Sequence, residues 1–445
     1  MVMSLEDLPD DILIRIVEMI HDFDTIFKIL PSVSRRIRSV LKIYLRYRST
    51  VRVKLYQHLD KPRALASILK RVHAIDTLML YHNCTADGYP SDWHNIGIDG
   101  GESSIVIVAK ACRNLRGLHI NCLNNISPAF FSRLSETCKK LTSLNIKGVV
   151  NEIHTHTPGP CPLLHGMSLE WAGALRRVTL PVGNWVTSKF VDTFLEMCTS
   201  LIYLNIPSNS HSMRLKYDAI ATHLPHIQTL ELRHYKCFNP ERIDDERMYN
   251  IFRNCRKLHT LKGAIYVTET FGVGIQMPIC SSLVHVDLSR SSITDEGLFR
   301  MIKSSPVLKD LGISRCTNLT GEGVARALRA FDARALYVGW DPNQADQIVN
   351  IIEIIAISTK TLTSLTMWQV AMDLEKWNLL LKANPNITGI RFSTMEITDE
   401  VIIAADKCCR KLEWMDFIWV VGHTANSAAI RRKFYRGFVA DPWHV

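Results

Sequence analysis

Short segments of alternating apolar and polar residues return along the chain at a nearly constant spacing. Residues 283–288 have the pattern L-x-x-L-x-L with Val286 at its fourth position, and residues 308–313 repeat it 25 positions later. Alternation with a period of two predicts a short strand, and the apolar spacing in the residues that follow each segment predicts a helix. The chain is therefore expected to repeat a unit of strand, turn and helix.

The repeat can be followed by the first apolar residue of each segment. These residues are Ile75, Leu115, Leu141, Leu175, Leu201, Ile227, Leu258, Leu283, Leu308, Ala333, Leu362, Ile387 and Leu412. Eight of the twelve intervals between them are 25 or 26 residues. Strand-sized segments at this period, each followed by an amphipathic stretch, indicate leucine-rich repeats.

The architecture follows from the spacing of the elements. Parallel strands stack about 4.8 Å apart, whereas packed helices need about 10 Å. The strands are therefore expected on the concave face of a curved α/β solenoid, and the helices on its convex face. Two long intervals contain insertions, and Leu164–Leu169 also fits the strand pattern only 11 residues before Leu175, so the frame there stays open.

The cysteines follow the same register. Six of them lie three residues before a first apolar residue: Cys112, Cys138, Cys198, Cys255, Cys280 and Cys409. Residues at one register of a solenoid stack in a column, where a thiol acts as a small buried apolar group. The array, residues 75–421, resembles the cysteine-containing subclass of leucine-rich repeats, which often accompanies F-boxes.

The first fifty residues have a different, helical pattern. Apolar spacing predicts helices over residues 8–20, 25–30 and 33–47, with Pro31 ending the second. Three short helices bury little apolar area and would be marginally stable alone. They could cap the repeat array, or they could form a module that docks an exposed apolar face on a partner.

Two short motifs favour the docking module. Leu8-Pro9 with Ile12-Leu13 and Ile16, followed by Val33-Ser34-Arg35, resembles an F-box over residues 5–48. That family docks on the Skp adaptor of cullin–RING ubiquitin ligases. The resemblance implies adaptor-facing roles for Leu8, Pro9, Ile12, Leu13, Ile16, Val33, Ser34 and Arg35. Ile37 stands where the family usually has tryptophan.

The net charge of +10 is concentrated in one segment. Residues 35–71 contain twelve Lys and Arg against one acid, Asp60, and residues 72–445 are close to neutral. A nucleic-acid-binding protein normally spreads basic residues over its working surface, so nucleic acid is not the expected partner. A role of residues 35–71 in binding nucleic acid would appear as a steep salt dependence.

The sequence also bears on location. The first residues do not form a secretory signal, and the longest apolar runs, such as 105–109, are too short to span a bilayer. We expect a soluble protein of the cytoplasm or nucleus, without a membrane partner.

Motifs for chemistry are not found in the sequence. It contains no C-x-x-C pair, phosphate-binding G-x-x-x-x-G-K-[ST], G-x-S-x-G or H-E-x-x-H. His154, His156, Cys161 and His165 lie together in a proline-rich segment, but their spacing matches no common zinc site. We expect an exposed loop there, and neither a metal, nor a cofactor, nor an enzymatic activity.

Bulky side chains in the last repeats predict a target-binding surface. Residues between the leucines of a strand segment should point out of the concave sheet. In the last four repeats the residues at or beside these positions are Tyr337, Trp340, Trp368, Arg391, Trp414 and Asp416. Aromatic and arginine side chains are typical of protein interfaces. Alternatively, the C-terminal tail folds back and covers Trp368 or Trp414.

The sequence thus predicts an F-box in residues 1–50, a basic linker or cap in 51–74, the repeat array in 75–421 and a tail in 422–445. The F-box resemblance implies the substrate-recognition subunit of an SCF-type E3 ubiquitin ligase, which binds a protein target as yet unknown. The alternative is a leucine-rich-repeat scaffold or inhibitor that acts outside ubiquitination, with the N-terminal helices as a cap.

Overall fold

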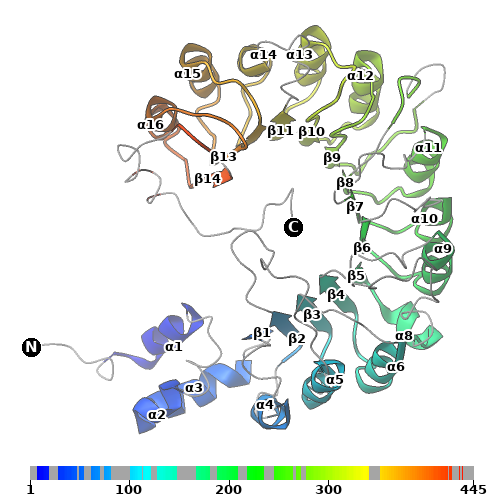
Figure 1. The fold of residues 1–445 in the computed structure, drawn as a ribbon, viewed down its shortest axis with the longest axis vertical. Helices are drawn as coiled ribbons and strands as arrows, with labels where there is room; N and C mark the ends of the chain where they lie inside the picture. The colour runs from blue at the N-terminus through cyan, green and yellow to red at the C-terminus, as the bar shows by residue number, and fades with distance from the viewer. Residues whose placement is uncertain are drawn as a thin grey trace, which may run out of the picture. The chain divides into compact units, whose positions relative to one another are not determined.

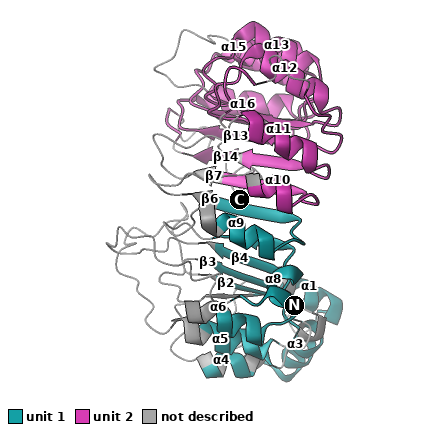
Figure 2. Ribbon diagram, turned by 90° about the vertical axis from the view of Figure 1, so that its right-hand side faces the viewer, with its two compact units in different colours: residues 1–215 teal, residues 216–445 magenta. Residues whose placement is uncertain are grey.

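The structure is a computed structural model of the 445-residue chain. It describes residues 8–19, 29–47, 50–54, 62–70, 75–81, 101–112, 114–121, 128–147, 167–180, 188–208, 218–234, 245–263, 267–271, 277–339, 351–418, 420–422, 430 and 433. These residues fall into two compact units, Met1–Leu215 and Lys216–Val445 (Figure 2).

The first unit begins with three helices and continues with repeats. The N-terminal helices are α1 (Asp10–Met19), α2 (Leu30–Val33) and α3 (Arg35–Tyr47). The strands are β1 (Thr50–Lys54), β2 (Thr77–Tyr81), β3 (Gly117–Asn121), β4 (Ser143–Lys147), β5 (Arg177–Thr179) and β6 (Tyr203–Ser208). The helices between them are α4 (Pro62–Leu69), α5 (Gly101–Ala111), α6 (Pro128–Thr137), α8 (Leu169–Ala174) and α9 (Ser188–Met197).

The second unit consists of repeats. Its strands are β7 (Thr229–His234), β8 (Thr260–Gly263), β9 (His285–Asp287), β10 (Asp310–Gly312), β11 (Ala335–Gly339), β12 (Ser364–Trp368), β13 (Gly389–Ser393) and β14 (Trp414–Ile418). Its helices are α10 (Asp218–His223), α11 (Asp245–Asn254), α12 (Asp295–Ser304), α13 (Gly321–Arg329), α14 (Ile351–Ser358), α15 (Leu374–Ala383) and α16 (Asp399–Cys408).

Within each unit the strands pair in parallel and in chain order. In the second unit, β9–β14 line the inner side of a curve and α11–α16 lie on its outer side (Figure 1). This is a leucine-rich-repeat solenoid, so the predicted fold class is confirmed. The predicted spacing holds throughout, because strands β2–β14 each begin two residues after the first apolar residue of their segment.

The core lies between the strand layer and the helix layer. All thirteen first apolar residues are buried. Cys112, Cys138, Cys198, Cys255 and Cys409 are buried as expected, whereas Cys280 is only partly buried. Burial raises the pKa of the Cys112 thiol from 9.0 to about 12. These cysteines therefore act as packing groups.

The structure adds detail to the sequence-based expectations at three places. Residues 51–74, expected as a linker or cap, contain most of β1, which pairs with β2, and α4. Pro31 was expected to end a helix but lies in the first turn of α2, where a missing N–H costs nothing. Leu169 begins α8, and β5 follows the frame of Leu175.

None of the helices that the structure describes is both long and apolar enough to cross a membrane.

Candidate functional site

The three N-terminal helices form a helical module, residues 8–19 and 29–47, with a small core of its own. Val17 of α1 packs with Ile37, Leu41 and Tyr44 of α3, and Ile14 covers the edge of this cluster. The core therefore ties α1 to α3 and leaves the opposite faces of these helices outside it.

A polar contact also fixes the start of α1 on α3. The Arg36 guanidinium donates from Nη2 to the carbonyl oxygen of Leu8 at 2.7 Å and to Asp10 Oδ1 at 3.1 Å. The first turn of α1 is thereby held against the start of α3. A basic residue of the charged segment thus has a structural role here.

The structure divides the eight predicted adaptor-facing residues between surface and interior. Exposed are Pro9, Ile12, Val33 and Arg35, and partly buried are Leu8, Ile16 and Ser34. Ile12 is 36% exposed and Val33 is 56% exposed, which is unusual for large apolar side chains. Leu13 differs from the other seven residues, because it is buried, with only 3% of it exposed.

Local packing explains two positions at the start of α3. Ser34 Oγ accepts a hydrogen bond from the backbone N–H of Ile37 at 3.1 Å, which caps the start of α3. Ile37 is 3% exposed and belongs to the core. Its side chain therefore forms part of the interior of the module.

Two further apolar residues on the surface were not predicted. Ile29, just before α2, and Ile43 on α3 are both exposed. Ile43 lies off the apolar stripe that places Ile37, Leu41 and Tyr44 inward. Its position off this stripe could have identified Ile43 as a surface residue from the sequence.

The second candidate surface lies on strands β9–β14 of the second unit, and we call it the strand face. Sheet register aligns its residues in columns that run across the strands. One column contains Gly312, Tyr337, Thr366, Arg391 and Asp416, and a second contains Asp310, Ala335, Ser364, Gly389 and Trp414. A third contains Gly339, Trp368, Ser393 and Ile418. The register thus brings the predicted target-binding residues together, except Trp340, which lies outside the described residues.

Arg391 is paired inside this face. It donates from Nε and from Nη2 to Asp416 Oδ2, both at 2.8 Å. Only 4% of Arg391 is exposed, although the sequence placed it at an exposed register. The ion pair therefore holds Arg391 and Asp416 together within the sheet.

Trp414 lies flat on the sheet beside this pair. A Cβ atom at Gly389 would lie 2.0 Å from Trp414 Cζ2, so the indole covers the space above the glycine. The Arg391 guanidinium carbon lies 6.0 Å from the indole centroid. A residue without a side chain is therefore needed at position 389.

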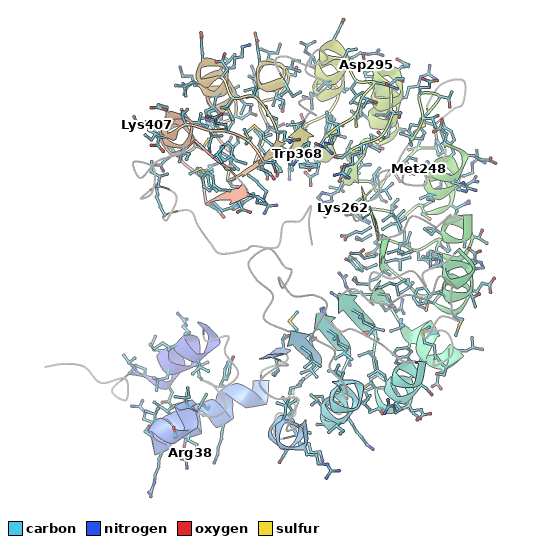
Figure 3. All side chains as sticks on the ribbon, in the orientation of Figure 1. Arg38, Met248, Lys262, Asp295, Trp368 and Lys407 are labelled. Atoms are coloured by element: carbon cyan, nitrogen blue, oxygen red, sulfur yellow. The ribbon has the colours of Figure 1, made fainter. Side chains whose placement is uncertain are left out.

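The Trp368 ring stacks with Arg315, a residue that was not predicted from the sequence. The guanidinium carbon of Arg315 lies 3.9 Å from the centroid of the Trp368 ring, and Arg315 Nη2 donates to Gln369 Oε1 at 3.4 Å. Figure 3 marks Trp368 beside the strand layer and Asp295 beside the helix layer. The stack is a cation–π contact that orients the guanidinium.

Tyr337 lies among charged groups of the two preceding repeats. Burial raises the pKa of the Tyr337 hydroxyl, and the charge of Asp287 raises it further. A hydrogen bond with Ser314 and the charges of Arg290 and Arg315 act in the opposite direction. The hydroxyl therefore stays protonated and can donate.

A recurrent backbone geometry places both arginines. Arg290 and Arg315 have φ angles of 68° and 58°, in the left-handed region. Each donates its backbone N–H to the neighbouring repeat, Arg290 to Ser314 O at 2.7 Å and Arg315 to Gly339 O at 2.9 Å. The left-handed turn thus continues the hydrogen-bond ladder beyond the strands.

Two sequence-based alternatives lie outside the described residues. Only Ile430 and Lys433 of the distal tail are described, and Lys433 Nζ contacts Asp406 Oδ1 of α16 at 2.7 Å. His154, His156, Cys161 and His165 fall in a segment that is not described. Among the residues that are described, no group of three or more His, Cys, Asp and Glu could hold a metal ion.

The repeat fold has a solved counterpart. A chain in the crystal structure of the yeast Rad7–Elc1 complex aligns with a TM-score of 0.51 and 18% identity, covering 88% of this chain and 94% of that one. At this identity the likeness establishes the fold alone.

The other comparisons add little. A chain in the TLR13–ssRNA13 complex aligns with a TM-score of 0.32 and 12% identity, over 87% of this chain and 60% of that one, which is too low to support an argument. No protein-family model and no curated protein sequence matches the chain.

Proposed function

We propose that this protein is the substrate-recognition subunit of an SCF-type ubiquitin ligase, acting in the cytoplasm or nucleus. The helical module binds the Skp adaptor, and the strand face binds a target protein. The observation that carries the proposal is the exposure of Ile12 and Val33 on a module whose helices already share a core. The counterpart in the Rad7–Elc1 complex, solved together with a second protein, supports a partner-binding role.

Docking would remove these apolar side chains from water. Complete burial of a Val or Ile side chain stabilises a complex by about 1.5–3 kcal/mol. Ile12 and Val33 are partly exposed, so each would contribute a fraction of that value. Ile29 is also exposed, and burial of large apolar side chains is typical of the centre of a protein interface.

The proposed role is one of positioning. A thiol that transferred ubiquitin itself would need an accessible thiolate. Burial instead raises the pKa of Cys138 and Cys255 to about 12, so both thiols are neutral at physiological pH. The repeat array would contribute by holding the target close to an enzyme recruited through the adaptor.

Co-purification with the Skp adaptor tests the proposal. The double variant Ile12→Ser/Val33→Ser should bind the adaptor at least about tenfold more weakly, because its docking face is polar. Ile357→Ser is the matched control, since Ile357 on α14 is 57% exposed but lies on a repeat helix. Circular dichroism should show that all variants keep the wild-type fold. Undiminished adaptor binding by the double variant would refute this docking face.

One observation favours the alternative of a scaffold or inhibitor outside ubiquitination. β1 begins at Thr50, three residues after α3 ends at Tyr47, and it pairs with β2. A module attached this closely to the first strand could serve as a cap. The two functions differ in whether the array needs the module to remain soluble.

A further inference from the structure

Arg290 and Arg315 occupy equivalent positions in neighbouring repeats. Both have left-handed backbones, and both follow strands that pair directly, β9 with β10. Neighbouring strands are about 4.8 Å apart, so the two backbones stack at about that spacing. Arg290 is exposed and Arg315 is partly buried, and both charges act on the hydroxyl of Tyr337.

Two other charged pairs lie on the strand face. Arg391 pairs with Asp416, and His285 contacts Asp310. The charge of Asp287 also reaches Tyr337. Asp287 Oδ1 already accepts the backbone N–H of Ser289 at 3.0 Å. Two arginines and one carboxylate thus act on the Tyr337 hydroxyl, so the charges that reach this hydroxyl are positive on balance.

The arginine side chains suit a planar anionic acceptor. Stacking on Trp368 holds the Arg315 guanidinium in one orientation, which reduces the entropy lost on binding. A guanidinium donates paired N–H groups that match the two oxygens of a carboxylate. The protonated hydroxyl of Tyr337 lies within the same group of side chains and adds a third donor.

We propose that Arg290, Arg315 and Tyr337 form a subsite for the carboxylate side chains of an acidic peptide segment in the target protein. This inference rests on the proposed function of the strand face as the target-binding surface. It adds the chemical class of the target and assigns selectivity to two arginines outside the predicted set.

Fluorescence anisotropy with the full-length protein tests the subsite. The probe is a fluorescein-labelled oligoglutamate peptide, and an oligoglutamine peptide of equal length is its neutral control. We expect the glutamate probe to bind more tightly, with an affinity that falls as salt is added. The variant Arg290→Gln/Arg315→Gln should weaken binding at least about tenfold.

A matched variant separates the subsite from the general effect of charge. Arg329→Gln changes an exposed arginine of α13, on the helix layer of the same unit, and should leave the affinity within about twofold. Equal binding of the two peptides, or an equal loss with Arg329→Gln, would overturn the proposal. Displacement of the probe by inorganic phosphate at lower concentration than by free glutamate would also overturn it, in favour of a phosphorylated target.

The adaptor assay keeps the two proposals distinguishable. Arg290→Gln/Arg315→Gln should co-purify with the Skp adaptor as the wild type does, because both residues lie in the second unit. If the wild type binds the glutamate probe but no adaptor, the acidic-segment subsite stands and the ubiquitin-ligase role falls. If it binds the adaptor without selecting the glutamate probe, the subsite falls alone.

Discussion

Arg391 and Asp416 form an ion pair whose two partners differ in their access to water. Both donor nitrogens of Arg391 bind one oxygen of Asp416, across the paired strands β13 and β14. The arginine side chain is 5% exposed and the aspartate side chain is 24% exposed. Water can therefore solvate Asp416 much better than Arg391 when the other partner is removed.

This difference predicts unequal costs for the two single substitutions. Asp416→Ala leaves a buried cation without its carboxylate and should destabilise the protein by about 3 kcal/mol. Arg391→Met keeps the volume and leaves a carboxylate that water can reach, so its cost should be about 1 kcal/mol. Urea denaturation of both variants measures the difference. Equal costs would mean that the pair is solvated evenly.

Two glycines should respond in opposite directions to alanine. A Cβ at Gly323 would lie 1.8 Å from Asp295 Cγ, and Asp295 accepts hydrogen bonds from Thr320 N at 2.8 Å and Thr320 Oγ1 at 2.5 Å. Gly323→Ala should therefore displace this contact between repeats and destabilise the protein by about 2 kcal/mol. Thermal denaturation measures the effect.

Gly173→Ala is the matched control, because a Cβ there meets no atom within 4 Å in helix α8. Alanine should stabilise that helix by about 0.5–1 kcal/mol. A loss of stability in both variants would show that the space around Gly323 is not the cause.

The buried thiols predict a loss of stability at alkaline pH. Burial raises the pKa of Cys316 from 9.0 to about 12. Below pH 9 the Cys316 thiol keeps its proton in both the folded and the unfolded chain, and burial of the neutral thiol contributes fully to stability. Between pH 9 and about 12 only the unfolded chain loses this proton. The contribution of Cys316 to the free energy of unfolding therefore falls by up to about 1.4 kcal/mol per pH unit.

Cys316→Ala isolates this contribution from tyrosine and lysine ionisation. Its free energy of unfolding, measured in urea at pH 8 and pH 10.5, should decline less than that of the wild type. An identical decline would contradict the proposed protonation of Cys316.

Removal of the helical module distinguishes docking from capping. A variant that begins at Thr50 keeps β1 and its pairing with β2. If the module is an adaptor-docking device, this variant should remain monomeric in size-exclusion chromatography, because β1 still covers the edge of β2. Aggregation of this variant would favour the scaffold function with a capping module.

The proposed arginine subsite shows which residues of the strand face sequence reasoning singled out and which it did not. Tyr337 and Trp368 were found because aromatic residues stand out within the strand pattern. Arg290 and Arg315 lie beyond the strands, in left-handed turns. The sequence does not indicate these turns, because neither position is a glycine. Their proximity depends on the parallel pairing of β9 with β10, which joins residues far apart in the chain.

The sequence by itself determined the repeat period, the start of strands β2–β14 and the burial of the first apolar residues. These features depend on local alternation and on the narrow range of spacings that lets strands and helices stack. The tertiary structure alone decided that Leu13 is interior, that Arg391 is buried against Asp416, and that Arg315 stacks on Trp368. Each of these depends on which side chain a neighbouring repeat or helix places opposite, and local periodicity carries no information about that partner.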